Sequence, residues 1–132
     1  MLDIFKEFAT DSSAETEGTW KDIGPGAAIK VARAGNDAYS EAIQKEVQEN
    51  RLALEVGGKA SKALNDAILA RVLAGTILKG WKGLSYQGKE IEYSFENAVK
   101  LLGHKEFREL VSGISGDFRN YLIKEEASQG NT

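Results

Sequence analysis

The stretch from Lys62 to Leu102 constrains the fold of this chain more than any other part of its sequence. Its first half carries apolar residues at spacings of three and four, which place one stripe along a single helical face. The stripe contains Leu64, Ile68, Leu69, Val72, Leu73, Ile77 and Trp81. Gly80 and Gly83 loosen the backbone on either side of the tryptophan. The spacing therefore predicts a central helix that reaches Trp81.

A tight reversal and a second helix follow the central helix. Residues 84–93 read LSYQGKEIEY, which is typical of a hairpin-like turn because Gly88 can adopt the positive φ that such a turn needs. Ser94 then occupies the N-cap position of a helix over residues 95–102, and Gly103 is expected to end that helix as a left-handed C-cap. We expect these elements to form one unit on which the rest of the chain packs.

Residues 20–34 predict a two-stranded β-ribbon around a Gly-Pro-Gly turn signature. After the turn, apolar and polar residues alternate, which places Ile29 and Val31 on one face of a half-buried strand. A two-stranded ribbon is marginally stable by itself, so it must lie on the helices. Residues 1–18 are expected to be a partly flexible segment that includes an exposed polar loop, DSSAETEG.

Two further amphipathic helices are predicted. Asn36 or Asp37 can cap a helix over residues 38–56, which a Gly-Gly pair ends. A second helix is expected from about residue 105 to residue 122, because its apolar residues recur at helical spacing. These apolar residues are Phe107, Leu110, Val111, Ile114, Phe118, Tyr121 and Leu122. Residues 127–132 are expected to fray as a C-terminal tail.

The predicted elements fit one domain that spans all 132 residues. We expect a mainly helical fold of the α+β class. A small N-terminal β-ribbon packs on a bundle of about four helices, with a short hairpin-like turn after the central helix.

Composition excludes several classes of protein. The chain has no cysteine, so disulfides and zinc sites with cysteine ligands are excluded. The net charge is −3 and the basic residues are dispersed, which argues against nucleic acid as an obligatory partner. No stretch is apolar enough for a membrane-spanning helix, and the N-terminus lacks a signal-peptide pattern. We therefore expect no nucleic-acid or membrane partner, and a protein that stays in the compartment where it is made.

The sequence contains no recognisable arrangement of catalytic residues. The one histidine, His104, stands at a helix junction and cannot make a conventional zinc site by itself. Carboxylate pairs such as Glu106 and Glu109 lie in charged contexts that are typical of solvated helix faces. No Ser/His/Asp set or phosphate-binding loop is recognisable. We expect no enzyme activity, no cofactor and no metal.

Aromatic residues gather around the central turn, and they allow two interpretations. Trp81, Tyr86, Tyr93 and Phe95 can pack in the core at a helix end, since aromatic side chains bury a large area. The alternative interpretation is that they anchor a partner, because Trp and Tyr are enriched at the centres of interfaces. The sequence leaves both interpretations open.

Several motifs resemble the tail assembly chaperones of long-tailed, siphovirus-type bacteriophages. They are Gly18-Thr19-Trp20, then Ala32-Arg33-Ala34-Gly35-Asn36, then AGTILKGWKGLSYQGKEIEYSFENAVKLL from residue 74, and then EFRELV. The family pattern of a Gly-Trp-x-Gly helix end falls on Leu78–Leu84, and its Gly-Lys turn falls on Gly88 and Lys89. Its Tyr/Phe-Ser-x-Glu-Asn-Ala segment falls on Tyr93–Ala98, followed by a Leu-Leu pair. One departure is the turn Ser85–Gln87, where acidic residues are frequent in the family.

The resemblance implies a non-enzymatic protein of the host cell cytoplasm that is absent from the mature virion. Such a chaperone binds and solubilises the tape measure protein, and it recruits tail tube protein through a possible frameshifted longer form. It is expected to act as a homo-oligomer. The residues expected to bind the partner are Trp81, Tyr86, Tyr93, Leu73, Ile77, Val111 and Ile114. The alternative is a structural tail component, of the completion or connector type, that stays in the virion.

Overall fold

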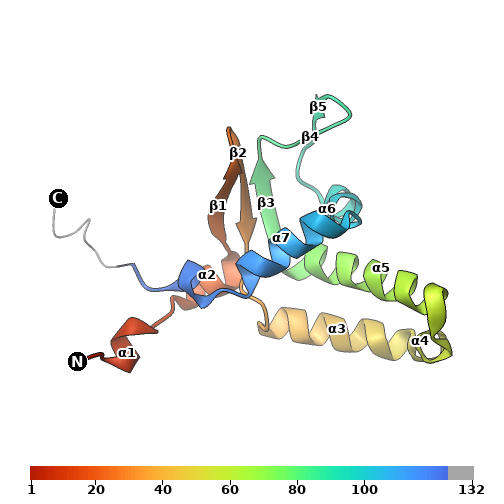
Figure 1. Ribbon diagram of the computed structural model, residues 1–132, viewed down its shortest axis with the longest axis horizontal. Coiled ribbons are helices and arrows are strands. Elements are labelled where there is room, and N and C mark those ends of the chain that lie inside the picture. Colours follow the sequence, from red (N-terminus) through yellow and green to blue (C-terminus); the bar gives the residue numbers. More distant parts are fainter. Residues whose placement is uncertain (125–132) are drawn as a thin grey trace.

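A three-stranded antiparallel sheet and a helical arm dominate the structure (Figure 1). The computed structural model describes residues 1–124. The sheet has the order β1-β2-β3, with β1 at Thr19–Gly24, β2 at Ala27–Val31 and β3 at Leu78–Lys82. A second, two-stranded hairpin joins β4 (Ser85–Tyr86) to β5 (Lys89–Glu90). The helices are α1 (Ile4–Glu7), α2 (Ser12–Glu17), α3 (Asp37–Glu49), α4 (Arg51–Val56), α5 (Gly58–Thr76), α6 (Phe95–Leu102), α7 (Lys105–Ser115) and the 3-10 turn η1 (Phe118–Tyr121). The predicted α+β class is confirmed.

The predicted β-ribbon is confirmed. β1 and β2 pair antiparallel, with Lys21 opposite Ile29, and the turn between them contains Gly26 at a φ of +72°. Both Ile29 and Val31 are fully buried, as the alternation of apolar and polar residues predicts. The ribbon does not stand alone, because β3 pairs with the other edge of β2.

Trp81 lies on a strand, so the prediction that the central helix reaches it is wrong. The helix α5 ends at Thr76, and Trp81 pairs with Ile29 across β2 and β3. The backbone amide of Ala32 donates to the carbonyl of Ile77 at 2.8 Å, which fastens the start of β3 to the end of β2. Pairing with β2 supplies backbone hydrogen bonds that the local helical pattern does not reveal.

Two shorter helices replace the single helix predicted over residues 38–56. Asn50 separates α3 from α4 with φ −113° and ψ 17°, and its side-chain amide donates to the carbonyl of Glu46 at 2.7 Å. This local hydrogen bond competes with the regular helix. The predicted cap at Asn36 is confirmed, because its side chain accepts from the amide of Tyr39 at 2.8 Å.

The C-terminal half holds one confirmed cap and two corrections. Ser94 caps α6 by accepting from the amide of Asn97 at 3.0 Å. Gly103 has a φ of −66°, so it is not the predicted left-handed cap. The helix predicted to run to residue 122 ends at Ser115, because Asp117 caps the separate turn η1 by accepting from the amide of Arg119. The predicted tail at residues 127–132 lies outside the described residues.

The polar segment near the N-terminus forms a short helix in place of the predicted loop. The side chain of Asp11 caps α2 by accepting from the amides of Ser13 and Ala14, at 2.9 and 3.3 Å. The carboxylate of Asp3 caps α1 in the same way. Two local acidic caps therefore begin two short helices within residues 1–18.

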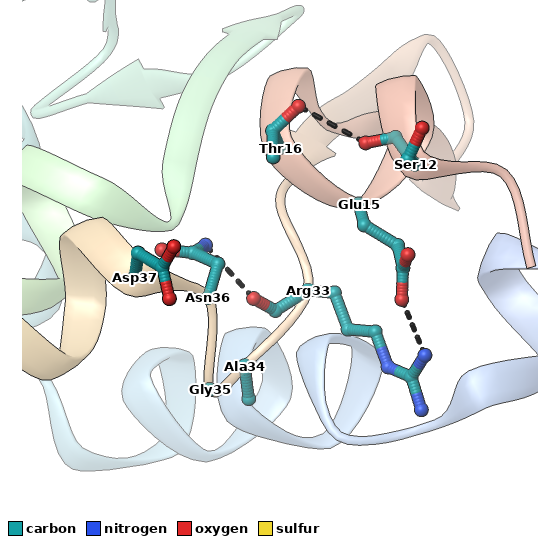
Figure 2. A pocket seen from close by; sticks show the side chains of 8 residues that line it. All are labelled: Ser12, Glu15, Thr16, Arg33, Ala34, Gly35, Asn36 and Asp37. Atoms are coloured by element: carbon teal, nitrogen blue, oxygen red, sulfur yellow. Dashed lines mark hydrogen bonds and ion pairs between the residues drawn. The ribbon is translucent and has the colours of Figure 1, made fainter.

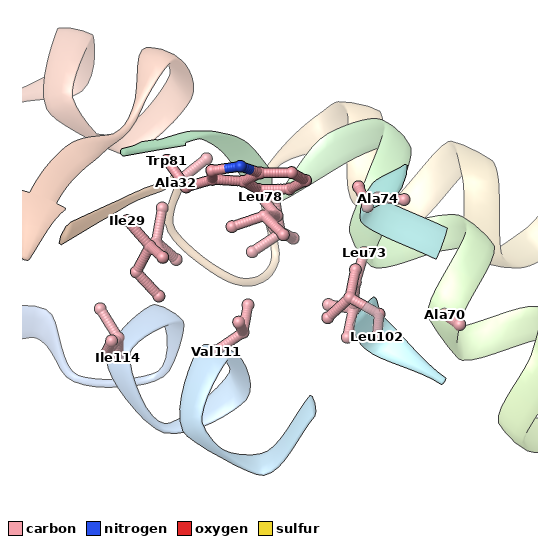
Figure 3. Close-up of a cluster of buried hydrophobic side chains, with 13 residues drawn as sticks. Ile29, Ala32, Ala70, Leu73, Ala74, Leu78, Trp81, Leu102, Val111 and Ile114 are labelled. Carbon is pink, nitrogen blue, oxygen red and sulfur yellow. The ribbon is translucent and has the colours of Figure 1, made fainter. Parts of the chain in front are cut away.

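The core lies where the sheet meets α5, α6 and α7 (Figure 3). Buried side chains from all four fill it, and Trp81 reaches them from β3. The cluster consists of Ile29, Val31, Ala32, Ala70, Leu73, Ala74, Ile77, Leu78, Trp81, Ala98, Leu102, Val111 and Ile114. In residues 1–124, no helix combines the length and hydrophobicity that crossing a membrane requires.

Candidate functional site

Most of the residues that the sequence nominates for partner binding lie in the core. Leu73, Ile77, Trp81, Val111 and Ile114 are between 0 and 8% exposed. Tyr86 and Tyr93 are 45% and 42% exposed. Of the nominated set, only these two tyrosines offer a substantial surface to another molecule.

The aromatic cluster fastens the β4-β5 hairpin to the sheet. The indole nitrogen of Trp81 donates to the carbonyl of Ile91 at 2.8 Å, and the Tyr93 hydroxyl donates to the carbonyl of Leu78 at 2.8 Å. The Trp81 and Tyr93 rings meet edge to face, with their centroids 5.0 Å apart. Burial of this hydroxyl raises the pKa of Tyr93. The core-packing interpretation therefore holds for Trp81, and Tyr93 combines a bonded hydroxyl with a partly exposed ring.

A groove with a largely apolar lining opens between this hairpin, the end of β1 and the helices α6 and α7. Its volume is about 500 Å³. It is lined by Ile23, Leu84, Ser85, Tyr86, Lys100, Leu101, Gly103, His104 and Phe107, which we call the hairpin groove. Its size falls in the range of cavities that bind small molecules or short peptide segments.

The lining of the hairpin groove carries one charged side chain, Lys100, and no carboxylate. His104 also lines the groove, and its Nδ1 lies 3.5 Å from a carboxylate oxygen of Glu106, which is not a lining residue. The Lys100 ammonium stands 5.5 Å from the centroid of the Tyr86 ring. This contact is a cation–π interaction, which leaves the charge available to a carboxylate. The groove is therefore suited to an apolar segment that carries a negative charge.

Sequence reasoning missed the apolar lining of this groove, although one signal was present. Leu101 and Leu102 are adjacent on α6, so their side chains point in directions about 100° apart. Leu102 is fully buried, while Leu101 is half-buried in the groove wall. Such an apolar pair on a short helix indicates a second apolar contact beyond the core. Phe107 belongs to the apolar stripe predicted after residue 105, whereas Leu84 carries no comparable local signal.

A second, polar cleft lies between α2 and the connection from β2 to α3 (Figure 2). Glu15 forms an ion pair with Arg33, and the backbone amide of Arg33 donates to the carbonyl of Glu15 at 2.8 Å. The Asn36 side chain donates to the carbonyl of Arg33 at 2.9 Å. These groups bind one another, so the cleft is a structural junction that holds α2 against the sheet.

Metal-ligating side chains do not gather in the described part of the chain. Residues 1–124 contain no group of three or more His, Asp or Glu that could hold a metal ion. The buried Arg108 is occupied by the carbonyl of Leu102 at 3.0 Å and by Asp66 at 3.6 Å. The hairpin groove is therefore the candidate binding surface.

Comparison with known proteins identifies one family. The model of the YdaY prophage protein family matches residues 34–130. This range includes the hairpin, α6 and α7, and hence every lining residue of the hairpin groove except Ile23. Searches of curated proteins and of solved structures found no significant match.

Proposed function

The chain belongs to the YdaY prophage protein family and is thus a phage-derived protein, and from this premise we propose that it is a tail assembly chaperone. Its hairpin groove binds an apolar helical segment of the tape measure protein and keeps that long chain soluble. The protein acts without catalysis, cofactor or metal. It works in the cytoplasm of the host cell, and a frameshifted longer form recruits tail tube protein.

The hairpin groove is the observation that carries this proposal. Its wall joins the side chains of Leu84, Leu101 and Phe107 to the half-exposed ring of Tyr86. An amphipathic helix that lies in such a groove buries its apolar face against the wall. Lys100 at the rim then meets a carboxylate on the edge of the bound helix.

The test is co-expression of this protein with the tape measure protein of the same phage. We expect the soluble fraction of the tape measure protein to rise, and a complex to survive size-exclusion chromatography. A tape measure protein that stays insoluble, with no complex, would reject the chaperone function. Recovery of this protein from purified virions would favour a structural tail component instead.

Variants of the groove locate the binding site. Tyr86→Ala and Leu101→Asp should each weaken binding at least about tenfold, because they remove an aromatic anchor and introduce an unpaired charge into an apolar wall. Leu110→Ala is the matched control, since Leu110 is 41% exposed on α7 and does not line the groove. Thermal unfolding of each variant separates lost binding from lost folding. Equal binding by all three variants would place the site elsewhere.

A further inference from the structure

The helices α3 and α4 lie against α5 without entering the core. The arm consists of α3 and α5, which run side by side, with α4 at its tip (Figure 1). Within the described residues 37–56 no residue is buried, whereas α5 contains six buried residues. Of this segment, only the half-buried Tyr39 packs against the core cluster. The segment is therefore held mainly by its contact with α5.

The face of α5 beneath α3 is apolar. Ile68 and Val72 are 1% and 2% exposed, but neither belongs to the core cluster. Ala70 and Ala74 do belong to it. Each of them lies two residues, or about 200° of helical turn, from Ile68 or Val72, so the two pairs point to opposite sides of α5. Since α6 joins the cluster on the alanine side, α3 is the helix that covers Ile68 and Val72.

A partly exposed ion pair fastens α3 to α5. Arg71, next to Val72, forms a bidentate pair with Glu46 of α3 at 2.7 and 3.0 Å, which we call the latch. The two side chains are 38% and 23% exposed, so solvent weakens their attraction. At the tip, the Ser61 hydroxyl donates to the carbonyl of Leu54 at 2.7 Å. These contacts close the segment onto α5 without a buried polar network.

Glycines stand at both ends of the segment. Gly35 precedes α3 with a φ of +82°, and Gly57 and Gly58 follow α4 with a φ of +79° each. A Cβ added at any of the three would meet nothing within 4 Å, so neighbouring atoms do not confine the backbone there. A few positions of this kind at the ends of an element can absorb the rotation of a moving segment.

We propose that residues 36–57 form a flap, which opens away from α5 about Gly35 and Gly57 while the sheet, α6 and α7 stay folded. Opening uncovers Ile68 and Val72 and breaks the latch. A helix of 13 residues is marginally stable by itself in water, so α3 melts when it leaves α5. The flap thus closes an apolar face of α5 and exposes it only transiently.

The test uses cysteine as a reporter, because the chain has none of its own. In the Val72→Cys variant the thiol lies under the flap, whereas in Val111→Cys it lies in the core cluster. The two variants are matched, since each replaces a buried valine by another small apolar side chain. An aromatic disulfide reagent in excess should label Val72→Cys at least about tenfold faster, because Val111→Cys reacts only after the core unfolds.

A second substitution in each reporter separates flap opening from global unfolding. Tyr121→Phe removes a hydrogen bond to β2 that stays intact when the flap opens, so it should speed labelling of Val111→Cys by about fivefold and leave Val72→Cys unchanged. Arg71→Gln removes the latch, which both openings break, so it should speed both reactions by roughly two- to fivefold. Lys105→Gln is the matched control, since it removes an exposed ion pair on α7 and should change the labelling of Val72→Cys by nothing.

Three results would overturn the proposal. They are equal labelling of the two reporters, equal acceleration of both by Tyr121→Phe, and no effect of Arg71→Gln on Val72→Cys. Hydrogen exchange of the unaltered protein checks the flap without any substitution. After correction for intrinsic rates, the amides of α3 and α4 should exchange as one group, at least about tenfold faster than those of β2 and α7. Equal protection of the two groups would also overturn the flap.

This inference does not depend on the proposed chaperone function. No residue of the flap lines the hairpin groove. Labelling and exchange are both measured on this protein alone, so a groove that fails to bind the tape measure protein leaves the flap unaffected. Uniform labelling with tape measure binding intact would reject the flap and keep the groove.

Discussion

Tyr121 shows how one buried hydroxyl ties the end of the described chain to the sheet. Its side chain is fully buried, and its hydroxyl donates to the carbonyl of Val31 at 3.1 Å. Burial raises the pKa of Tyr121 from 10.0 to about 12, because the charged phenolate is poorly solvated in the core. The ring of Tyr121 thus packs in the core, and its hydroxyl links η1 to β2 by a hydrogen bond.

This shift predicts the behaviour of the protein in alkali. Since the folded-state pKa is raised, the stabilisation from neutral Tyr121 is fully present below pH 10 and is lost as the pH rises through about 12. We expect Tyr121→Phe to lower the free energy of unfolding by about 1 kcal/mol at neutral pH, from loss of its hydrogen bond. Between pH 10 and pH 12, the variant should lose stability less steeply than the wild type.

Urea unfolding at a series of pH values measures this difference. Some alkaline loss should remain in the variant, because burial also raises the pKa of Tyr93. The same slope in both proteins would show that Tyr121 reaches solvent before the protein unfolds. It would then contradict the role assigned to Tyr121.

At the scale of elements, two helix caps could be predicted from the sequence, whereas the caps at Asp3 and Asp11 and the long-range pairing of β3 could not. The caps at Asn36 and Ser94 depend on hydrogen bonds across three residues, and both were predicted correctly. The strand β3 depends on pairing with β2, about 50 residues earlier, while its apolar spacing also fits a helix. The apolar spacing by itself therefore assigns Trp81 to the central helix, although it lies on β3.

The same limit applies to the candidate site. Periodicity finds the apolar face of a helix, but it does not tell whether another element covers that face. Val111 and Ile114 face the sheet and are buried, whereas Tyr86 on the hairpin is exposed. The groove arises where α6, α7, the hairpin and the end of β1 meet, and no single segment of sequence encodes it.

Gly83 tests the packing of β3 against the β1-β2 turn. Its φ is +74°, and an added Cβ would overlap the carbonyl oxygen of Gly26. We expect Gly83→Ala to lower the free energy of unfolding by about 3 kcal/mol or more, since backbone atoms must move apart. Gly88→Ala is the matched control, because Gly88 has a similar φ of +81° with nothing near its would-be Cβ.

The control should lose only about 1 kcal/mol, the cost of a left-handed backbone in a residue with a side chain. Thermal or urea unfolding of both variants measures the difference between them. Equal losses would mean that the β1-β2 turn moves away from Gly83 at little cost. The close approach of these two backbones would then contribute nothing to the placement of β3.

At the scale of the whole molecule, the hairpin groove lies apart from the arm that α3, α4 and α5 form. The groove is lined by residues of β1, of the hairpin segment and of α6 and α7, and no residue of the arm lines it. Its lining is mainly apolar, with one exposed lysine. Binding in the groove should therefore depend on apolar burial more than on charge.

Salt should therefore have little effect on binding in the hairpin groove. Added salt screens exposed charges such as that of Lys100, because the Debye length shortens from about 10 Å at 0.1 M to about 3 Å at 1 M. Burial of apolar surface in the hairpin groove is not screened. We expect the groove to keep most of its affinity for the tape measure segment when sodium chloride rises from about 0.1 M to about 1 M. Calorimetric titration at the two salt concentrations measures this affinity. If salt instead removed groove binding, the contact would depend mainly on Lys100, and a partner recognised by its charge would replace the apolar helix proposed here.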